Sequence, residues 1–326
     1  MALIQSISIL SVFLFVCTSY TVAGTFEKDT SYTTIQTWQK IRKKYPEIKI
    51  VSPIQDKDLI SAEDVVHKTI FSENGEKRDL HLDIYRPAQK CKYPALIMIH
   101  GGGWRSGNKS MERPMAQQIA LNGYAAITVE YRLSLEARYP TAIHDIKAAI
   151  RWIKDNSDQY DIDTTKIAIE GESAGGQLAM LVAMTNKVEK FEGEKNGSKS
   201  TSTIHAVIDV DGVVDFLAPN SLNTPRKPDS PDAYWLGGVF EDKPLIWKDA
   251  SPIYWVNKNS VPVLFITSSV PRFHAGRDEM IDLLNQNGIY SESYSIADSP
   301  HSFWMYEPWF EPTKKYFLKF LNKLFK

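Results

Sequence analysis

The segment that most clearly predicts a chemical function is Gly-Glu-Ser-Ala-Gly at 171–175, which follows an apolar run and precedes a helical pattern. A serine in this pattern, on a strand-to-helix turn, is the usual setting of a serine nucleophile. The turn is so tight that side chains at Gly171 and Gly175 would collide with the flanking strand and helix. The helix N-terminus beside Ser173 favours developing negative charge. We therefore predict that Ser173 is a nucleophile; the alternative is a glycine-rich connection without a catalytic role.

A second glycine-rich segment, His-Gly-Gly-Gly-Trp at 100–104, follows the apolar run at 95–99. Glycines let backbone N–H groups approach a tetrahedral oxyanion without obstruction by side chains. We predict an oxyanion hole formed by the N–H groups of Gly102, Gly103 and Ala174. Losing one such donor costs about 2.7–4 kcal/mol of transition-state stabilisation.

The general base is predicted from chain order and position. Where the nucleophile follows a strand in this way, the acid and then the histidine come later in the chain. His301 lies beyond the strand-like segment at 291–296 and ahead of a C-terminal helical pattern, so we predict that it is the base. Its competitor, His274, lies near the start of the preceding helix.

The acid of the triad is the member that the sequence specifies least. The five residues after the apolar run at 261–266 contain no carboxylate. Asp278, just beyond, is the first choice, although a carboxylate in the first turn of a helix is favourable without any catalytic role. Asp215, after the run at 206–210, is the second choice, and Asp298 would have to curl back to reach the base.

The elements that must position these residues alternate between apolar strands and amphipathic helices. Strands are predicted at residues 81–85, 95–99, 124–129, 166–169, 206–210 and 261–266. Helices are predicted around residues 35–41, 142–153 and 177–184. This alternation predicts an α/β fold with a mostly parallel central sheet and helices on both faces. The polar segments at 187–203 and 218–232 are predicted surface excursions, and the second is a candidate lid or substrate-contact segment.

Composition and charge limit the class of protein. The 326 residues include 38 Lys and Arg against 39 Asp and Glu, a formal net charge of −1. A hydrophobic fraction of 43% with 24% charged residues is typical of a globular protein and excludes disorder, collagen and coiled coil. The near-zero charge gives no electrostatic footprint for nucleic acid.

The N-terminus carries an apolar run at residues 7–16, which is too short to span a membrane and is typical of a signal peptide. We predict a signal peptide at 1–23 and a single α/β domain at 24–326, exported to the periplasm or the extracellular space. Acylation of Cys17 is an alternative, but Val16 stands where lipoprotein sites have a small residue. After cleavage Cys91 is the only cysteine, so no intrachain disulfide is expected.

With these motifs the chain resembles the α/β-hydrolase superfamily, and within it the HGGG-type esterases. It looks most similar to bacterial carbohydrate esterases that act as acetylxylan or pectin acetylesterases. The resemblance covers residues 67–325 and extends beyond the two motifs to residues 129–134, Asp215, 234–238, 271–278, 300–304 and 307–312. It implies an α/β-hydrolase fold, and it implies acetyl as the acyl group.

Substrate contacts are predicted from aromatic and cationic residues near the predicted site. Trp104 follows the glycine loop and Trp304 follows His301, where aromatic faces would suit sugar rings. Arg272, with His274 and Arg277 nearby in the sequence, could meet a uronate carboxylate. The alternatives are that the aromatic residues pack the C-terminal helix onto the sheet and that the arginines pair with nearby acidic residues.

We expect a two-step acyl transfer without metal or cofactor, in a secreted esterase acting on acetylated polysaccharide or oligosaccharide. No metal is expected at His100, which lacks carboxylates at ligand spacing. One alternative is a broad short-chain or feruloyl esterase. An alternative of another class is an inactive binding protein with a hydrolase fold. The presence of Ser173 and His301 argues against this alternative, whereas the absence of a carboxylate just after residues 261–266 favours it.

Overall fold

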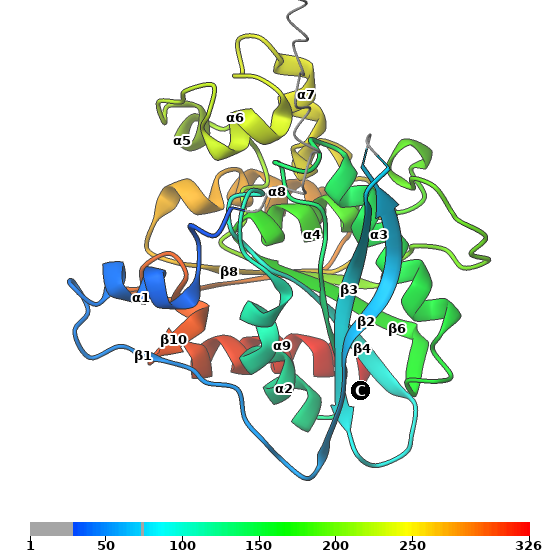
Figure 1. Cartoon of the computed structure of the whole chain (residues 1–326). Helices are drawn as coiled ribbons and strands as arrows, with labels where there is room; N and C mark the ends of the chain where they lie inside the picture. The colour runs from blue at the N-terminus through cyan, green and yellow to red at the C-terminus, as the bar shows by residue number, and fades with distance from the viewer. Residues whose placement is uncertain (1–28, 73–74) are drawn as a thin grey trace, which may run out of the picture.

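The computed structural model of the chain describes residues 29–72 and 75–326 (Figure 1). The predicted signal peptide at 1–23 and Cys17 lie outside the described residues. Within the described ranges, every helix is too short or too polar to cross a membrane.

The centre of the fold is an eight-stranded sheet with the order β2-β3-β5-β4-β6-β7-β8-β9. Its strands are β2 (Leu59–Phe71), β3 (Lys77–Pro87), β4 (Tyr93–Ile99), β5 (Ala125–Val129), β6 (Ile162–Glu172), β7 (Ala206–Val210), β8 (Val263–Thr267) and β9 (Ser291–Ser295). The β2–β3 and β3–β5 pairs are antiparallel, and every pair from β5 to β9 is parallel. The predicted α/β class with a mostly parallel sheet is confirmed.

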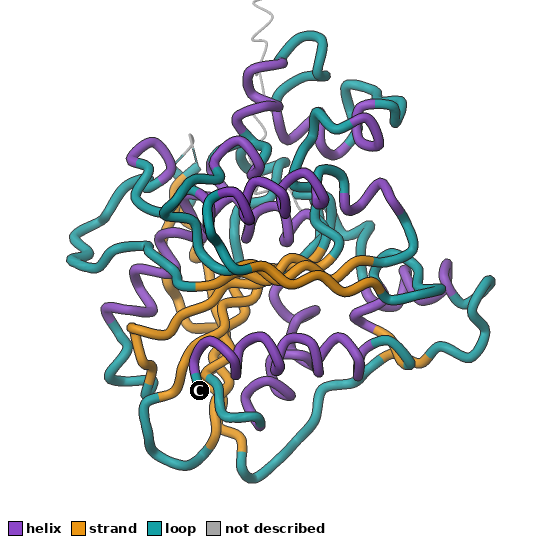
Figure 2. The backbone as a smooth tube through the Cα atoms, turned by 180° about the vertical axis from the view of Figure 1, so that it is seen from behind, coloured by secondary structure: helices purple, strands orange, loops and turns teal. Residues whose placement is uncertain are grey.

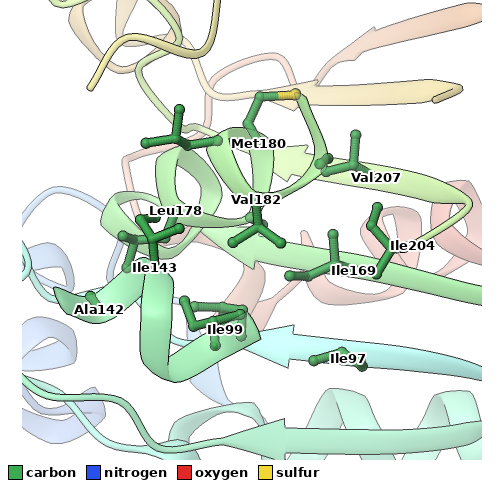
Figure 3. Packing of buried hydrophobic residues seen from close by; sticks show 14 of the residues in the cluster. Ile97, Ile99, Ala142, Ile143, Ile169, Leu178, Met180, Val182, Ile204 and Val207 are labelled. Carbon is green, nitrogen blue, oxygen red and sulfur yellow. The ribbon is translucent and has the colours of Figure 1, made fainter. Parts of the chain in front are cut away.

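Helices cover both faces of this sheet, which Figure 2 shows nearly edge-on. One face packs against α3 (Thr141–Asp155), α4 (Ala174–Met184) and α8 (Arg277–Gln286), and the other against α2 (Arg113–Leu121) and α9 (Phe310–Phe325). Because side chains alternate along a strand, Ile97 and Ile99 join the first core and Leu96 and Met98 join the second. Figure 3 shows part of the first core, including Ile143, Leu178, Val182, Ile99 and Ile169.

The strand β2 escaped prediction because it lies at the edge of the sheet. Its residues alternate irregularly between half-buried and exposed positions and include charged side chains such as Glu63 and Lys68. By contrast, every residue of β5, β7 and β8 is buried, which explains why their continuous apolar runs identified them.

Residues 219–249 form a cap that contains three short helices, which lie at the top of the view in Figure 1, above α4 and α8. They are α5 (Pro219–Leu222), α6 (Pro231–Leu236) and α7 (Pro244–Asp249). Arg226 ties the cap together, because its Nε donates to Asp232 Oδ2 at 2.6 Å and its Nη1 donates to the Ser221 carbonyl oxygen at 2.7 Å. The guanidinium also lies 4.9 Å from the centre of the Trp247 ring.

The remaining elements are short and lie outside the main sheet. The predicted N-terminal helix is α1 (Thr34–Ile41), and β1 (Lys49–Ile50) pairs with β10 (Tyr306–Glu307) in an antiparallel ribbon. The 3-10 helices are η1 (Lys109–Glu112), η2 (Glu189–Phe191), η3 (Pro252–Trp255), η4 (Pro271–His274) and η5 (Phe303–Met305).

Candidate active site

Ser173 occupies the single residue between β6 and α4, with φ 55° and ψ −120°. This backbone conformation is sterically unfavourable for a residue with a Cβ atom, and such strain is characteristic of functional sites. The turn is fixed from outside, because the Ser173 N–H donates to the Val210 carbonyl oxygen at 2.8 Å. The predicted strand–turn–helix setting of Ser173 is therefore present.

The flanking glycines are required by close backbone contacts. A Cβ atom on Gly171 would lie 2.2 Å from the Gly175 carbonyl oxygen, at the start of the helix. A Cβ atom on Gly175 would lie 2.0 Å from the carbonyl oxygen of Ile99, at the end of β4. Both distances are far below van der Waals contact, so only glycine lets the helix begin this close to the sheet.

His301 joins Ser173 to a carboxylate. Its Nε2 atom lies 2.8 Å from Ser173 Oγ, and its Nδ1 atom lies 2.8 Å from Asp211 Oδ2. The ring of Phe273 stacks on the imidazole at a centroid distance of 3.4 Å and an interplanar angle of 10°. Because the carboxylate can only accept, Nδ1 carries the hydrogen and Nε2 is free to accept the serine proton. The structure thus brings Ser173 and His301 together, as the sequence predicts.

The acid beside His301 is Asp211, and the expectation that Asp278 takes this place is wrong. Asp278 lies on α8 with its side chain 76% exposed, where Arg277 Nε donates to its Oδ1 at 2.8 Å. That hydrogen bond lowers the pKa of the Asp278 carboxyl. Asp211 is fully buried instead, and its second oxygen accepts the Ser268 N–H at 2.7 Å.

The two other candidate acids are also away from the imidazole. Asp215 turns back on its own loop, where its Oδ1 accepts the Leu217 N–H at 2.8 Å. Asp298 is exposed, with a left-handed backbone at φ 51°.

The position of Asp211 follows from strand order. Because β7 is the neighbour of β6 in the sheet, the residue directly after β7 lies beside the residue directly after β6. Asp211 is that residue and Ser173 is its counterpart. The sequence does carry a signal for Asp211, because it is a carboxylate immediately after the apolar run at 206–210, four residues before Asp215.

The glycine loop lies against the nucleophile. Gly102, Gly103 and Ala174 line the same cavity as Ser173. In the part of the chain that the structure describes, the N–H groups of Gly102 and Gly103 have no hydrogen-bond acceptor. Ala174 opens α4, where a helical N–H has no partner within the helix. These free donors are what an oxyanion hole requires.

His100 supports this loop from beneath. Its Nδ1 lies 2.8 Å from the Gly101 carbonyl oxygen, and its ring stacks on Tyr131 at 4.6 Å. Burial lowers the pKa of His100 to about 4, so the imidazole is uncharged near neutral pH. We infer that His100 is a packing residue of the oxyanion loop.

A cavity of about 430 Å³ opens above Ser173 and His301. Its walls come from the glycine loop, from Tyr32 near the start of the described chain, and from the cap. The cap contributes Ser221, Thr224, Pro225, Arg226, Ser230, Pro231 and Asp232. The predicted excursion at 218–232 therefore forms one wall of the cavity.

The two tryptophans expected to bind substrate have other partners. Trp104 is 8% exposed, stacks on Trp235 at 5.0 Å, and donates through Nε1 to Gln177 Oε1 at 2.9 Å. It contributes only an apolar surface to the cavity. Trp304 is buried with its ring edge-on to His301 at 5.2 Å, and it lines a different cavity. The expectation that Trp304 stacks on substrate is wrong, because segment 303–305 is buried in the core beneath the sheet.

Arg272 remains available at the mouth of the cavity. It is exposed, it lines the cavity, and its guanidinium lies 5.4 Å from the centre of the Phe273 ring, which in turn stacks on His301. Among the described residues it forms no ion pair. Its neighbour Arg277 forms an ion pair with Asp278, and its Nη1 donates to Thr267 Oγ1 at 3.0 Å. For Arg277, the alternative that the arginines pair with nearby acidic residues is therefore confirmed.

A parallel sheet that presents a strained serine after one strand, with histidine and aspartate bonded in series beside it, defines an α/β-hydrolase. The comparisons with known proteins refine this class. The BD-FAE family model matches residues 82–283, and the chain belongs to the BD-FAE family. The matched region includes the glycine loop, Ser173 and Asp211, while His301 lies beyond it.

Among curated proteins, esterase LipC of Mycobacterium tuberculosis is 30% identical over 221 residues, which are 67% of this chain and 53% of LipC. The chain spans about half the length of the curated relatives it matches. Among solved structures, a truncated carbohydrate esterase from gut microbiota is 28% identical with a TM-score of 0.72, over 83% of this chain and 99% of that one. A bifunctional GH43-CE protein of Bacteroides eggerthii is 26% identical with a TM-score of 0.69, over 82% of this chain and 36% of that one.

Proposed function

We propose that this protein is a secreted serine carboxylic-ester hydrolase that removes acetyl groups from plant cell-wall polysaccharide. The observation that carries the proposal is the continuous hydrogen-bonded series from Ser173 Oγ through His301 to Asp211. The esterase names of the curated relatives, and the carbohydrate esterase among the similar structures, support the same reaction class.

The first half of the reaction acylates the serine. His301 Nε2 accepts the Ser173 proton as Oγ attacks the ester carbonyl carbon, and Asp211 stabilises the imidazolium that forms. The N–H groups of Gly102, Gly103 and Ala174 donate to the oxyanion of the tetrahedral intermediate. The intermediate collapses as the imidazolium protonates the leaving sugar hydroxyl, which leaves an acyl-serine.

The second half releases the acid. A water molecule gives its proton to His301 Nε2 as its oxygen attacks the acyl carbon, and the same oxyanion donors hold the second tetrahedral intermediate. Its collapse returns the proton to Ser173 Oγ and frees acetate. No step requires a group other than these residues and water.

The proposed substrate rests on the cavity and its cation. The catalytic cavity of about 430 Å³ has polar cap residues on one wall and the exposed Arg272 at its mouth. A guanidinium is well suited to a carboxylate, so Arg272 favours a uronate-bearing chain such as pectin over neutral xylan. Export through the predicted signal peptide would bring the enzyme to such polymers.

The test is acetate release by the purified chain, without residues 1–23, from acetylated pectin and from uronate-free acetylated xylan. We expect release from both polymers, faster from pectin, with p-nitrophenyl acetate as a positive control. Hydrolysis of p-nitrophenyl acetate without acetate release from either polymer would contradict the polysaccharide assignment and favour a broad short-chain esterase. Preferential release of ferulate from methyl ferulate would favour a feruloyl esterase.

The contribution of Arg272 is tested in the same assay with Arg272→Gln. Losing a hydrogen bond to a charged partner costs about 1.5–3 kcal/mol, so we expect KM for acetylated pectin to rise about tenfold or more, with little change for neutral xylan. An equal change for both polymers would show that Arg272 acts through its stacking on Phe273 rather than through the carboxylate.

A further inference from the structure

Three glutamates meet in the interior directly behind the nucleophile. Glu170 and Glu172 come from the end of β6, and Glu112 comes from η1. Their exposed fractions are 0%, 1% and 3%, and one carboxylate oxygen from each lies within 4.8 Å of the others. This glutamate cluster takes no part in the mechanism proposed above.

Several carboxylate oxygens of the glutamate cluster have no hydrogen-bond partner among the described residues. Both carboxylate oxygens of Glu170 and the Oε2 atom of Glu172 are buried without a hydrogen-bond partner in the described structure. Glu112 and Glu172 lie within hydrogen-bond reach of each other, so one shared proton could join them. That proton would leave the Glu170 carboxyl group buried and without a partner, which is a costly state.

No protein cation compensates this concentration of acid. Within residues 29–72 and 75–326, no lysine, arginine or histidine forms an ion pair with Glu112, Glu170 or Glu172. The ionisable groups acting on Glu170 are themselves carboxyls, namely Glu112 and Asp209. A cation bound among the three side chains would satisfy all of them at once.

A second cavity, of about 190 Å³, reaches this cluster. Glu112 and Glu172 line it, together with the hydroxyl-bearing residues Thr34, Ser52 and Ser110. It is distinct from the catalytic cavity, since the two have no lining residue in common. Its volume has room for water molecules, and its lining offers them polar partners.

We propose that Glu112, Glu170 and Glu172 bind a calcium ion, whose remaining ligands are water molecules in the adjoining cavity. The donor set is made of oxygen atoms alone, which suits a hard cation. Calcium–oxygen distances of about 2.3–2.6 Å allow two oxygens on one ion to lie up to about 4.6–5.2 Å apart. The three carboxylate oxygens, all within 4.8 Å of one another, are therefore close enough to share one calcium ion. An irregular, partly hydrated site suits calcium better than magnesium, which demands near-ideal octahedral geometry.

The role of the ion would be to join two segments of the active site. Glu112 ends η1, which follows the oxyanion loop, and Glu172 immediately precedes Ser173. A cation between them would hold the loop against the nucleophile turn from behind. This proposal departs from the expectation that the protein holds no metal.

The test compares protein treated with EDTA against the same protein after addition of calcium. We expect isothermal titration to give one calcium ion per chain and the melting temperature to rise with calcium. Tb³⁺, a calcium substitute, should show luminescence sensitised by Trp304, which lines the same cavity, and excess calcium should quench it. Glu170→Gln should abolish the calcium response, while Asp278→Asn, which removes an exposed carboxylate of α8 outside the cluster, should retain it.

Several outcomes would overturn the proposal. Titration of the native chain without binding heat, together with a melting temperature indifferent to calcium and EDTA, would mean that the cluster is held by protons alone. A response to magnesium but not to calcium would contradict the choice of ion. If Glu170→Gln does not fold, the native-chain titration and the terbium competition still decide the matter. Because every readout is binding or stability, failure here leaves the proposed esterase function untouched.

Discussion

Replacing Asp211 with asparagine lowers kcat/KM for p-nitrophenyl acetate by about 10⁴-fold, the loss that such a change causes when the acid of a triad becomes an amide. The physical reason is the tautomer of His301. The carboxylate accepts the hydrogen on Nδ1 at 2.8 Å, whereas an amide can donate there and move that hydrogen to Nε2. Nε2 would then no longer accept the proton of Ser173. The measurement is steady-state hydrolysis, with melting temperature as a check on folding.

The matched control is Asp278→Asn. Asp278 pairs with Arg277 at an exposed site, so its replacement is expected to leave kcat/KM within about twofold of the native value. A large loss in Asp278→Asn, with little loss in Asp211→Asn, would mean that Asp278 moves to His301 in the working enzyme. It would also mean that the Asp211 contact is not catalytic.

The second large effect is expected from Ser173→Ala. Removing the nucleophile of a serine triad lowers kcat by about 10⁶-fold, and what remains comes from the oxyanion hole and substrate binding. Fold stability should change little, because the alanine methyl group replaces the side chain without adding an atom. Acetate release from polymer should disappear together with p-nitrophenyl acetate hydrolysis. Persistent polymer activity in this variant would place the polysaccharide reaction at another site.

Much of the fold could be predicted because buried parallel strands carry a strong signal. The runs that became β4, β5, β7 and β8 are apolar on both faces, and they were identified within one or two residues. The edge strand β2 was missed because one face of it meets solvent, and its charged residues hide the pattern. An apolar run in the sequence identifies a buried strand well. It does not identify a strand at the edge of the sheet, which is only partly buried.

Within the site, residues fixed by local motifs were predicted and residues fixed by tertiary neighbours were not. The Ser173 turn is set by the glycines on either side of it, and those glycines are visible in the sequence. Which acid reaches His301 depends on β7 lying beside β6, which no local pattern records. Likewise, Phe273 lies within the segment 271–278 that contributes to the family resemblance. Its stacking on the imidazole, however, depends on the tertiary position of η4 beside His301.

The aromatic residues after His301 illustrate the reverse case. Trp304 was expected to bind sugar rings because it follows His301, yet it is buried in the core beneath the sheet, together with Tyr306, Trp309 and Phe310. Closeness in sequence to a catalytic residue therefore did not bring these rings to the substrate. Tyr32, which is distant in sequence, does line the catalytic cavity, and its hydroxyl lies 3.1 Å from Ser302 Oγ.

We infer that His301 and Asp211 activate Ser173, and covalent labelling measures that activation directly. The native chain, Asp211→Asn and Asp278→Asn would be treated with diethyl p-nitrophenyl phosphate, and modification would be followed by intact mass and peptide mapping. We expect one diethylphosphoryl group on Ser173, added at similar rates in the native chain and Asp278→Asn, and about 10³–10⁴-fold more slowly in Asp211→Asn. A label on another residue, or equal rates in all three proteins, would contradict the account.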